Sequence, residues 1–137
     1  MSRLIKGGWH LAGGHGAIDS DQARADMAQF VEAGITTFDC ADIYTGVEAL
    51  IGSFLRAYPS LAKQVQVHTK FVPDLAVLKT ADRPYVESII DRSLTRLGTE
   101  CLDLVQLHWW TSPSRATWKQ LSSWIACGAR ARSRVSV

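Results

Sequence analysis

Four side chains in the first 110 residues could donate or accept protons at a common site. Asp39 and Tyr44 lie five residues apart after one apolar run, while Lys70 and His108 each stand near the end of a later run. Singly, each has a structural explanation: a turn cap, a ring at the edge of the core, a solvated charge and a satisfied histidine. Together, a carboxylate, a phenol, an ammonium and an imidazole indicate general acid–base chemistry.

The elements that must position these residues are strands and helices in alternation. Runs of strand length occur in "RLIKGGWH", "ITTFDC", "VQVHTKFV" and "CLDLVQLHWW", separated by three segments with apolar residues at helical spacing. The first helix should be capped by Ser20 or Asp21 and end at Gly34, and the third should follow Asp82 and end at Gly98. Apolar residues at helical spacing are Ala23, Met27, Phe30 and Val31, then Val47, Leu50, Ile51, Phe54 and Leu55, and then Val86, Ile90, Leu94 and Leu97.

Strands that alternate with helices at a regular interval predict an α/β fold with parallel strands. Ionisable residues at three strand ends, including Asp42 and His68 beside the four above, favour a (β/α)8 TIM barrel, in which chemistry collects at that edge. A doubly wound dinucleotide-binding sheet would need G-x-G-x-x-G after its first strand, and the glycines of "GGWHLAGGHG" are spaced differently. We therefore predict about the first four βα units of a barrel, a half barrel.

Composition limits the other classes of function. A chain of 137 residues with 47% hydrophobic and 20% charged residues suits one soluble globular domain. It has no apolar run of membrane-spanning length and no signal-peptide pattern, so we expect a cytoplasmic protein without membrane partners. Cys40, Cys101 and Cys127 are far apart with no CxxC pair, which predicts free thiols and no metal site.

Three motifs together resemble the aldo-keto reductase family. "TTFDCADIYTGVEALIG" is similar to the family's Asp-x-Ala-x-x-Tyr signature, "HTKF" to its lysine strand, and "SLTRLGTECLDLVQLHWW" to its helix-to-histidine strand. The resemblance covers residues 3–110, which would form the N-terminal half of the family's barrel. It implies an NADPH-dependent oxidoreductase that reduces an aldehyde or ketone to an alcohol.

The resemblance also implies roles for individual residues. Asp39, Tyr44, Lys70 and His108 would be the catalytic residues, and Trp9 and Asp39 would bind the cofactor. A phenol with a reference pKa of about 10 is a weak proton donor at neutral pH, but a nearby ammonium favours the phenolate. Tyr44 would then donate the proton, Lys70 would tune it, and Asp39 would keep the ammonium charged. His108 would hydrogen-bond to the carbonyl oxygen as its negative charge grows.

The segment 111–137 differs from the rest of the chain. It holds five basic and no acidic residues, whereas residues 1–110 hold all 13 acidic ones. If one base is missing before the codon of Thr111, synonymous codons exist with which the other frame encodes a loop, an amphipathic helix and the start of a fifth strand. We therefore expect an out-of-frame or irregular tail, and neither a nucleic-acid partner nor a membrane partner for its arginines.

Two other functions remain open from the sequence. The chain could be a non-catalytic, cofactor-binding regulatory subunit, or a half-barrel interaction module that self-associates through its open edges. If the chain is part of a carbonyl reductase, as the family resemblance implies, its partner is a small-molecule carbonyl substrate. This truncated chain is expected to be inactive alone, because most of the family's NADPH-binding residues lie in the second half of the barrel.

Overall fold

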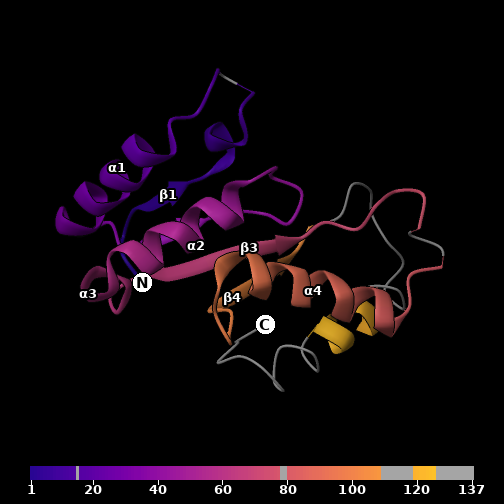
Figure 1. Cartoon of the computed structure of the whole chain (residues 1–137). Coiled ribbons are helices and arrows are strands. Elements are labelled where there is room, and N and C mark those ends of the chain that lie inside the picture. Colours follow the sequence, from indigo (N-terminus) through magenta and orange to yellow (C-terminus); the bar gives the residue numbers. More distant parts are fainter. Residues whose placement is uncertain (15, 78–79, 109–118, 126–137) are drawn as a thin grey trace.

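The computed structural model describes residues 1–14, 16–77, 80–108 and 119–125 (Figure 1). Within these ranges no helix has both the length and the apolar character needed to cross a bilayer. The elements are β1 (Ile5–Gly7), the 3-10 helix η1 (Trp9–Ala12), α1 (Ser20–Glu32), β2 (Thr37–Asp39), α2 (Val47–Ala57), α3 (Pro59–Ala62), β3 (Gln66–Phe71), α4 (Arg83–Leu97) and β4 (Leu104–Leu107).

The four strands form one parallel sheet in the order β1-β2-β3-β4. Each strand therefore pairs with its neighbour in sequence, and helices α1, α2 and α4 provide the crossovers between them. This arrangement confirms the predicted α/β fold of a half barrel. Because all the strands are parallel, their carboxyl ends lie at one edge of the sheet, where the candidate residues were expected.

The sheet has one face against the helices and one facing away from them. Phe38 pairs with Val67, and the Phe38 ring lies 5.8 Å from the ring of Phe54 on α2. The next pair, Asp39 with His68, has the opposite orientation because side chains alternate along a strand. The core between the sheet and the helices contains Met27, Val31, Phe38, Val47, Ile51, Phe54, Val67, Phe71, Val86, Ile90, Leu97 and Val105.

The ends of the helices follow the predicted signals with one correction. Asp19, not Ser20 or Asp21, caps α1, because its Oδ1 accepts hydrogen bonds from the backbone N–H groups of Asp21 and Gln22 at 2.9 and 3.1 Å. Ser20 is already the first helical residue, and a capping side chain must precede the helix. Gly98 ends α4 with φ of 66°, as the sequence indicated.

Helices α2 and α4 approach closely at Gly52. A Cβ atom at this position would lie 2.5 Å from the carbonyl oxygen of Arg96 and 2.6 Å from that of Leu97. Both atoms belong to the backbone, so they cannot move aside without shifting α4. Gly52 therefore sets the distance between the two helices.

We expect Gly52→Ala to destabilise the protein by roughly 1–3 kcal/mol, because the added methyl group overpacks the contact between the helices. Urea unfolding followed by circular dichroism measures this change. Gly7→Ala is the matched control, since nothing lies within 4 Å of the Cβ it would add. Equal stability of the two variants would contradict the close approach.

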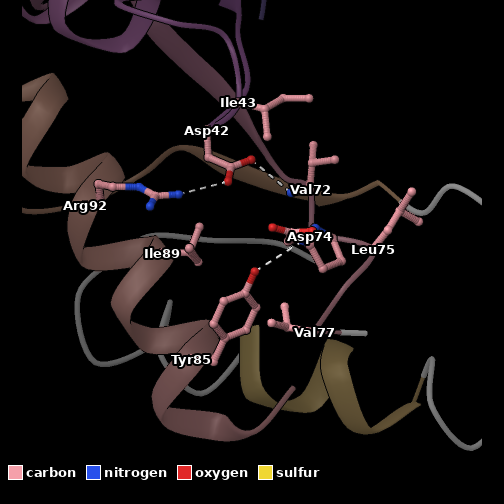
Figure 2. A pocket seen from close by; sticks show the side chains of 10 residues that line it. Asp42, Ile43, Val72, Asp74, Leu75, Val77, Tyr85, Ile89 and Arg92 are labelled. Carbon is pink, nitrogen blue, oxygen red and sulfur yellow. Dashed lines mark hydrogen bonds and ion pairs between the residues drawn. The ribbon is translucent and has the colours of Figure 1, made fainter. Parts of the chain in front are cut away.

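A further helix occurs in the segment that follows residue 110. Residues 119–125 are helical, and Leu121 and Ile125 are 2% and 1% exposed within the core. Figures 1 and 2 both show this helix, in yellow, beside α4. Four-residue spacing places both side chains on one face. The other residues of 111–137 lie outside the described ranges, and the out-of-frame origin stays a prediction.

Candidate active site

Asp39 and Lys70 form an ion pair at the carboxyl ends of β2 and β3. The Lys70 Nζ donates to Asp39 Oδ2 at 2.5 Å and to the carbonyl oxygen of Cys40 at 3.0 Å. Both side chains are mostly buried, with 17% exposed for Lys70 and 27% for Asp39. Removal from water strengthens the attraction between the charges, so the ammonium is held in place rather than free in solvent.

Tyr44 lies beside this ion pair. The segment between β2 and α2 forms two tight turns, since the Tyr44 amide donates to the carbonyl of Ala41 and the Tyr44 carbonyl accepts from the Val47 amide. The Lys70 Nζ lies 5.4 Å from the centroid of the Tyr44 ring. The structure thus brings Asp39, Tyr44 and Lys70 together, as predicted.

His108 follows β4 directly, and its backbone N–H donates to the carbonyl oxygen of Phe71 at 3.0 Å. Lys70 pairs with Gln106, and His108 lies two residues further along. Alternation therefore assigns His108 to the same face of the sheet as Lys70, one strand away. Its side chain is exposed.

Trp9 begins η1, immediately after Gly8, whose backbone N–H donates to the carbonyl oxygen of Asp39 at 2.8 Å. This bond fixes the start of η1 against the end of β2. The Trp9 side chain is 61% exposed. The predicted cofactor residues Trp9 and Asp39 are thus joined through the backbone of Gly8.

Two buried groups beneath the ion pair have perturbed pKa values. Burial lowers the pKa of His68, whose neighbour Asp103 acts in the opposite direction, so neutral imidazole is favoured. Burial likewise raises the pKa of the Cys40 thiol to about 12. Cys40 is therefore a neutral packing residue and not a nucleophile.

This pKa predicts that Cys40 resists alkylation. At pH 8 about one Cys40 side chain in 10,000 would be a thiolate, which is the reactive form. In a Cys127→Ser background, iodoacetamide should label the exposed Cys101 first and Cys40 only after denaturation. Mass spectrometry of the peptides reads this out, and equally rapid labelling of both thiols would contradict the burial of Cys40.

Asp42 is another ionisable residue at the strand ends, and its side chain contacts groups other than Asp39 and Lys70. Its Oδ1 accepts from the Val72 N–H at 2.9 Å and its Oδ2 from the Arg92 guanidinium at 3.3 Å (Figure 2). Burial raises its pKa, opposed by these same groups. Asp42 lines a pocket of about 460 Å³ between the loop after β3 and α4, with Tyr85 on the opposite wall.

Three buried or half-buried polar residues near the site were missed from the sequence. Glu48 is 1% exposed, and its Oε1 accepts from the hydroxyl of Thr69 at 2.7 Å. The Arg96 guanidinium reaches Glu48 Oε2 at 3.2 Å and the carbonyl oxygen of Asp42 at 2.8 Å. The sequence does contain one sign of this buried contact. Glu48 lies three residues before Ile51, which puts a charged side chain on the apolar face of α2.

The arrangement suits proton transfer more than nucleophilic or metal chemistry. It offers a tyrosine, a group that can donate a proton, whose ring centroid lies 5.4 Å from the mostly buried Lys70 ammonium. The described residues contain no cluster of three His, Cys, Asp or Glu side chains able to hold a metal ion.

Comparison with known proteins decides the family. The sequence pattern described as "Aldo/keto reductase family" matches residues 3–129, which includes all five candidate residues and extends beyond residue 110. The chain belongs to the aldo/keto reductase family. In this aldo/keto reductase chain the matched range contains Asp39, Tyr44, Lys70 and His108, whose catalytic roles stay a prediction.

Relatives and solved structures agree with this assignment. The chain is 36% identical over 122 residues to the 6-dehydroglucose reductase of Novosphingobium aromaticivorans, covering 79% of this chain and 38% of the relative. It is 32% identical over 123 residues to the 6-dehydroglucose reductase of Agrobacterium fabrum, covering 79% of this chain and 40% of that enzyme.

Among solved structures, an aldo-keto reductase from Klebsiella pneumoniae in complex with NADPH superposes with a TM-score of 0.71 at 25% identity. The superposition covers 97% of this chain and 44% of the Klebsiella chain. The chain thus spans less than half the length of these relatives and has the fold of half a barrel.

Proposed function

We propose that this chain supplies the proton-donating half of an NADPH-dependent carbonyl reductase, which reduces an aldehyde or ketone to an alcohol. The observation that carries the proposal is the Lys70 ammonium held between the Asp39 carboxylate and the face of the Tyr44 ring. Tyr44 donates its proton to the carbonyl oxygen. Lys70 stabilises the negative charge left on the phenol, and Asp39 holds Lys70 in position.

His108 completes the set from the next strand. An imidazole on the same face as Lys70 can donate a hydrogen bond to the substrate oxygen, which orients the carbonyl and stabilises its growing charge. The resemblance of "DLVQLHWW" to the family's histidine strand supports this assignment, and the family match covers that segment.

The residues present fit the nicotinamide end of NADPH. The exposed indole of Trp9 offers a flat apolar surface, and the mostly buried Asp39 carboxylate offers hydrogen-bond acceptors. Trp9 and Asp39 would hold this end of the cofactor, and NADPH when bound supplies the hydride. The Klebsiella pneumoniae structures contain NADPH in one case and NADP with acetate in the other, which supports this choice of cofactor.

The names of two relatives suggest a substrate. Both 6-dehydroglucose reductases share about a third of their matched residues with this chain. We therefore propose 6-dehydroglucose as the first aldehyde to test, followed by simple aliphatic and aromatic aldehydes.

The test requires a complete barrel that contains residues 1–108. It can be made by restoring the reading frame at Thr111 and expressing the longer product, or by joining residues 1–108 to the second half of the Klebsiella pneumoniae reductase. We expect consumption of NADPH that depends on the aldehyde. A folded barrel that binds NADPH and consumes none with any aldehyde would favour a regulatory role instead.

The 137-residue chain alone should not bind NADPH measurably. The phosphate and adenosine sites of the family lie mostly in the second half of the barrel, which leaves Trp9 and Asp39 to bind only the nicotinamide end. Isothermal titration calorimetry should show no heat of binding, and a micromolar dissociation constant would contradict this expectation. In the described sheet β1 and β4 are the edge strands, since each pairs with a neighbour on one side. Self-association through these edges stays a prediction. A cytoplasmic location also stays a prediction.

A further inference from the structure

The segment that carries Tyr44 lacks regular secondary structure, so its position depends on side-chain and backbone contacts. Asp42 makes several of these. Its backbone N–H donates to the carbonyl oxygen of Lys70 at 3.1 Å, and its Oδ1 accepts from the Val72 N–H at 2.9 Å. Both bonds join the segment to β3 and the residue that follows it.

Arg96 adds a second connection from α4. One nitrogen of its guanidinium, Nη1, donates to the carbonyl oxygen of Asp42 at 2.8 Å and to Glu48 Oε2 at 3.2 Å. Glu48 Oε1 in turn accepts from the Thr69 hydroxyl at 2.7 Å. Thr69 is the residue next to Lys70 in β3, so the chain of bonds runs from the Tyr44 segment to the strand that carries the ammonium.

This network is mostly removed from water. The side chain of Glu48 is 1% exposed, Thr69 is 1% exposed, and the Arg96 side chain is 37% exposed. Burying a carboxylate is costly even when it is paired, and an apolar residue would fill the same volume at less cost. A geometric role in holding the Tyr44 segment gives a reason for this arrangement.

We propose that Arg96, supported by Glu48 and Thr69, is a positioning residue that sets where Tyr44 lies relative to Lys70. The proposal rests on the proposed role of Tyr44 as proton donor. Catalytic groups must be held within about half an ångström of their productive geometry, which a loop achieves only when its supporting shell is itself fixed. Arg96 provides such support from a helix, because it bonds to the backbone two residues before Tyr44.

The test measures the geometry of the 137-residue chain by NMR, without NADPH. The ring of Tyr44 should shift the ε-methylene protons of Lys70 upfield, and Tyr44→Leu identifies this ring-current shift because it removes the ring. We expect Arg96→Met to reduce the shift at least twofold. Hydrogen exchange at the amides of Asp42 and Tyr44 should accelerate roughly tenfold, as expected for the loss of a charge-assisted hydrogen bond.

Thr69→Val is the second variant, since it removes one hydroxyl and preserves side-chain volume. It should change the Lys70 shift in the same direction, and it keeps the test open if Arg96→Met does not fold. Arg24→Met on α1 is the matched control, because the ion pair that Arg24 forms among the described residues is a local one, with Asp21. Exchange at the amides of Phe38 and Val67 should be unchanged in every folded variant.

Two results would overturn the proposal. One is an unchanged Lys70 shift in both network variants. The other is faster exchange throughout the sheet with Arg96→Met, together with no change at Tyr44 in Thr69→Val, which would make the network structural only. Neither readout involves turnover, so a barrel inactive toward carbonyls would count against the proposed function and leave this geometric result to be judged separately.

Discussion

Tyr44→Phe in a complete barrel carrying residues 1–108 should lower kcat for carbonyl reduction about a thousandfold. The substitution keeps the ring that lies 5.4 Å from the Lys70 ammonium and removes only the hydroxyl that carries the proton. General acid catalysis by a positioned side chain contributes between about a hundredfold and ten thousandfold to the rate, so removal of the proton donor should lower kcat by a factor in this range. Affinity for NADPH should stay the same, because the phenol acts in the chemical step.

Stopped-flow measurement of NADPH absorbance separates the chemical step from binding in this variant. Tyr85→Phe is the matched control, since the Tyr85 hydroxyl accepts a hydrogen bond from the Asp74 amide at 3.2 Å, outside the proposed site. It should retain normal turnover. A Tyr44→Phe enzyme with near-normal kcat would show that another group donates the proton.

Lys70→Met should lower kcat about a hundredfold in the same barrel. The Lys70 ammonium is only 17% exposed, so water cannot replace it easily, and its loss leaves both the phenol and Asp39 without their cation. Removing one partner of a buried pair also leaves an uncompensated charge, here the Asp39 carboxylate. We therefore expect a lower melting temperature together with the lower kcat.

Steady-state kinetics and thermal unfolding of the same preparations measure both effects of Lys70→Met. Lys63→Met removes an exposed lysine at the end of α3 and serves as the control. If Lys70→Met lost stability but kept its turnover, the ion pair would have a structural role only. A different cation would then have to stabilise the negative charge left on the Tyr44 phenol.

Much of the fold could be predicted because its signals are local. Apolar spacing fixed the three long helices, and Gly34 and Gly98 stand at their ends with the positive φ values that glycine tolerates. The alternation of strands and helices then implied a parallel sheet. The N-cap of α1 was misplaced by one residue or two, because Asp19, Ser20 and Asp21 are all good caps and the sequence does not distinguish among them.

The candidate site was predicted from strand ends, since parallel strands bring their carboxyl ends to one edge. That rule found Asp39, Tyr44 and Lys70, which the structure joins. It could not find the contacts among Asp42, Glu48 and Arg96, because these depend on how α4 packs beside α2, over a separation of about 50 residues. The spacing of these three residues in the sequence does not indicate how the two helices pack.

The helix over residues 119–125 was missed for a related reason. Leu121 and Ile125 are too few to form a periodic stripe, and the basic residues of the segment outnumber its acidic ones by five to none, which is typical of a solvated chain. The short helix is identified by the burial of Leu121 and Ile125 in the core.

Hydride transfer measured with NADPH that carries deuterium at the reactive position of its nicotinamide tests the central claim most directly. A complete barrel containing residues 1–108 would be incubated with this cofactor and 6-dehydroglucose or another aldehyde, and the alcohol analysed by mass spectrometry. We predict one deuterium per molecule of alcohol, and formation of this alcohol about a thousandfold more slowly when Tyr44 is replaced by Phe. A folded, cofactor-binding barrel that forms no deuterated alcohol from any aldehyde would contradict the assignment of this chain to a carbonyl reductase.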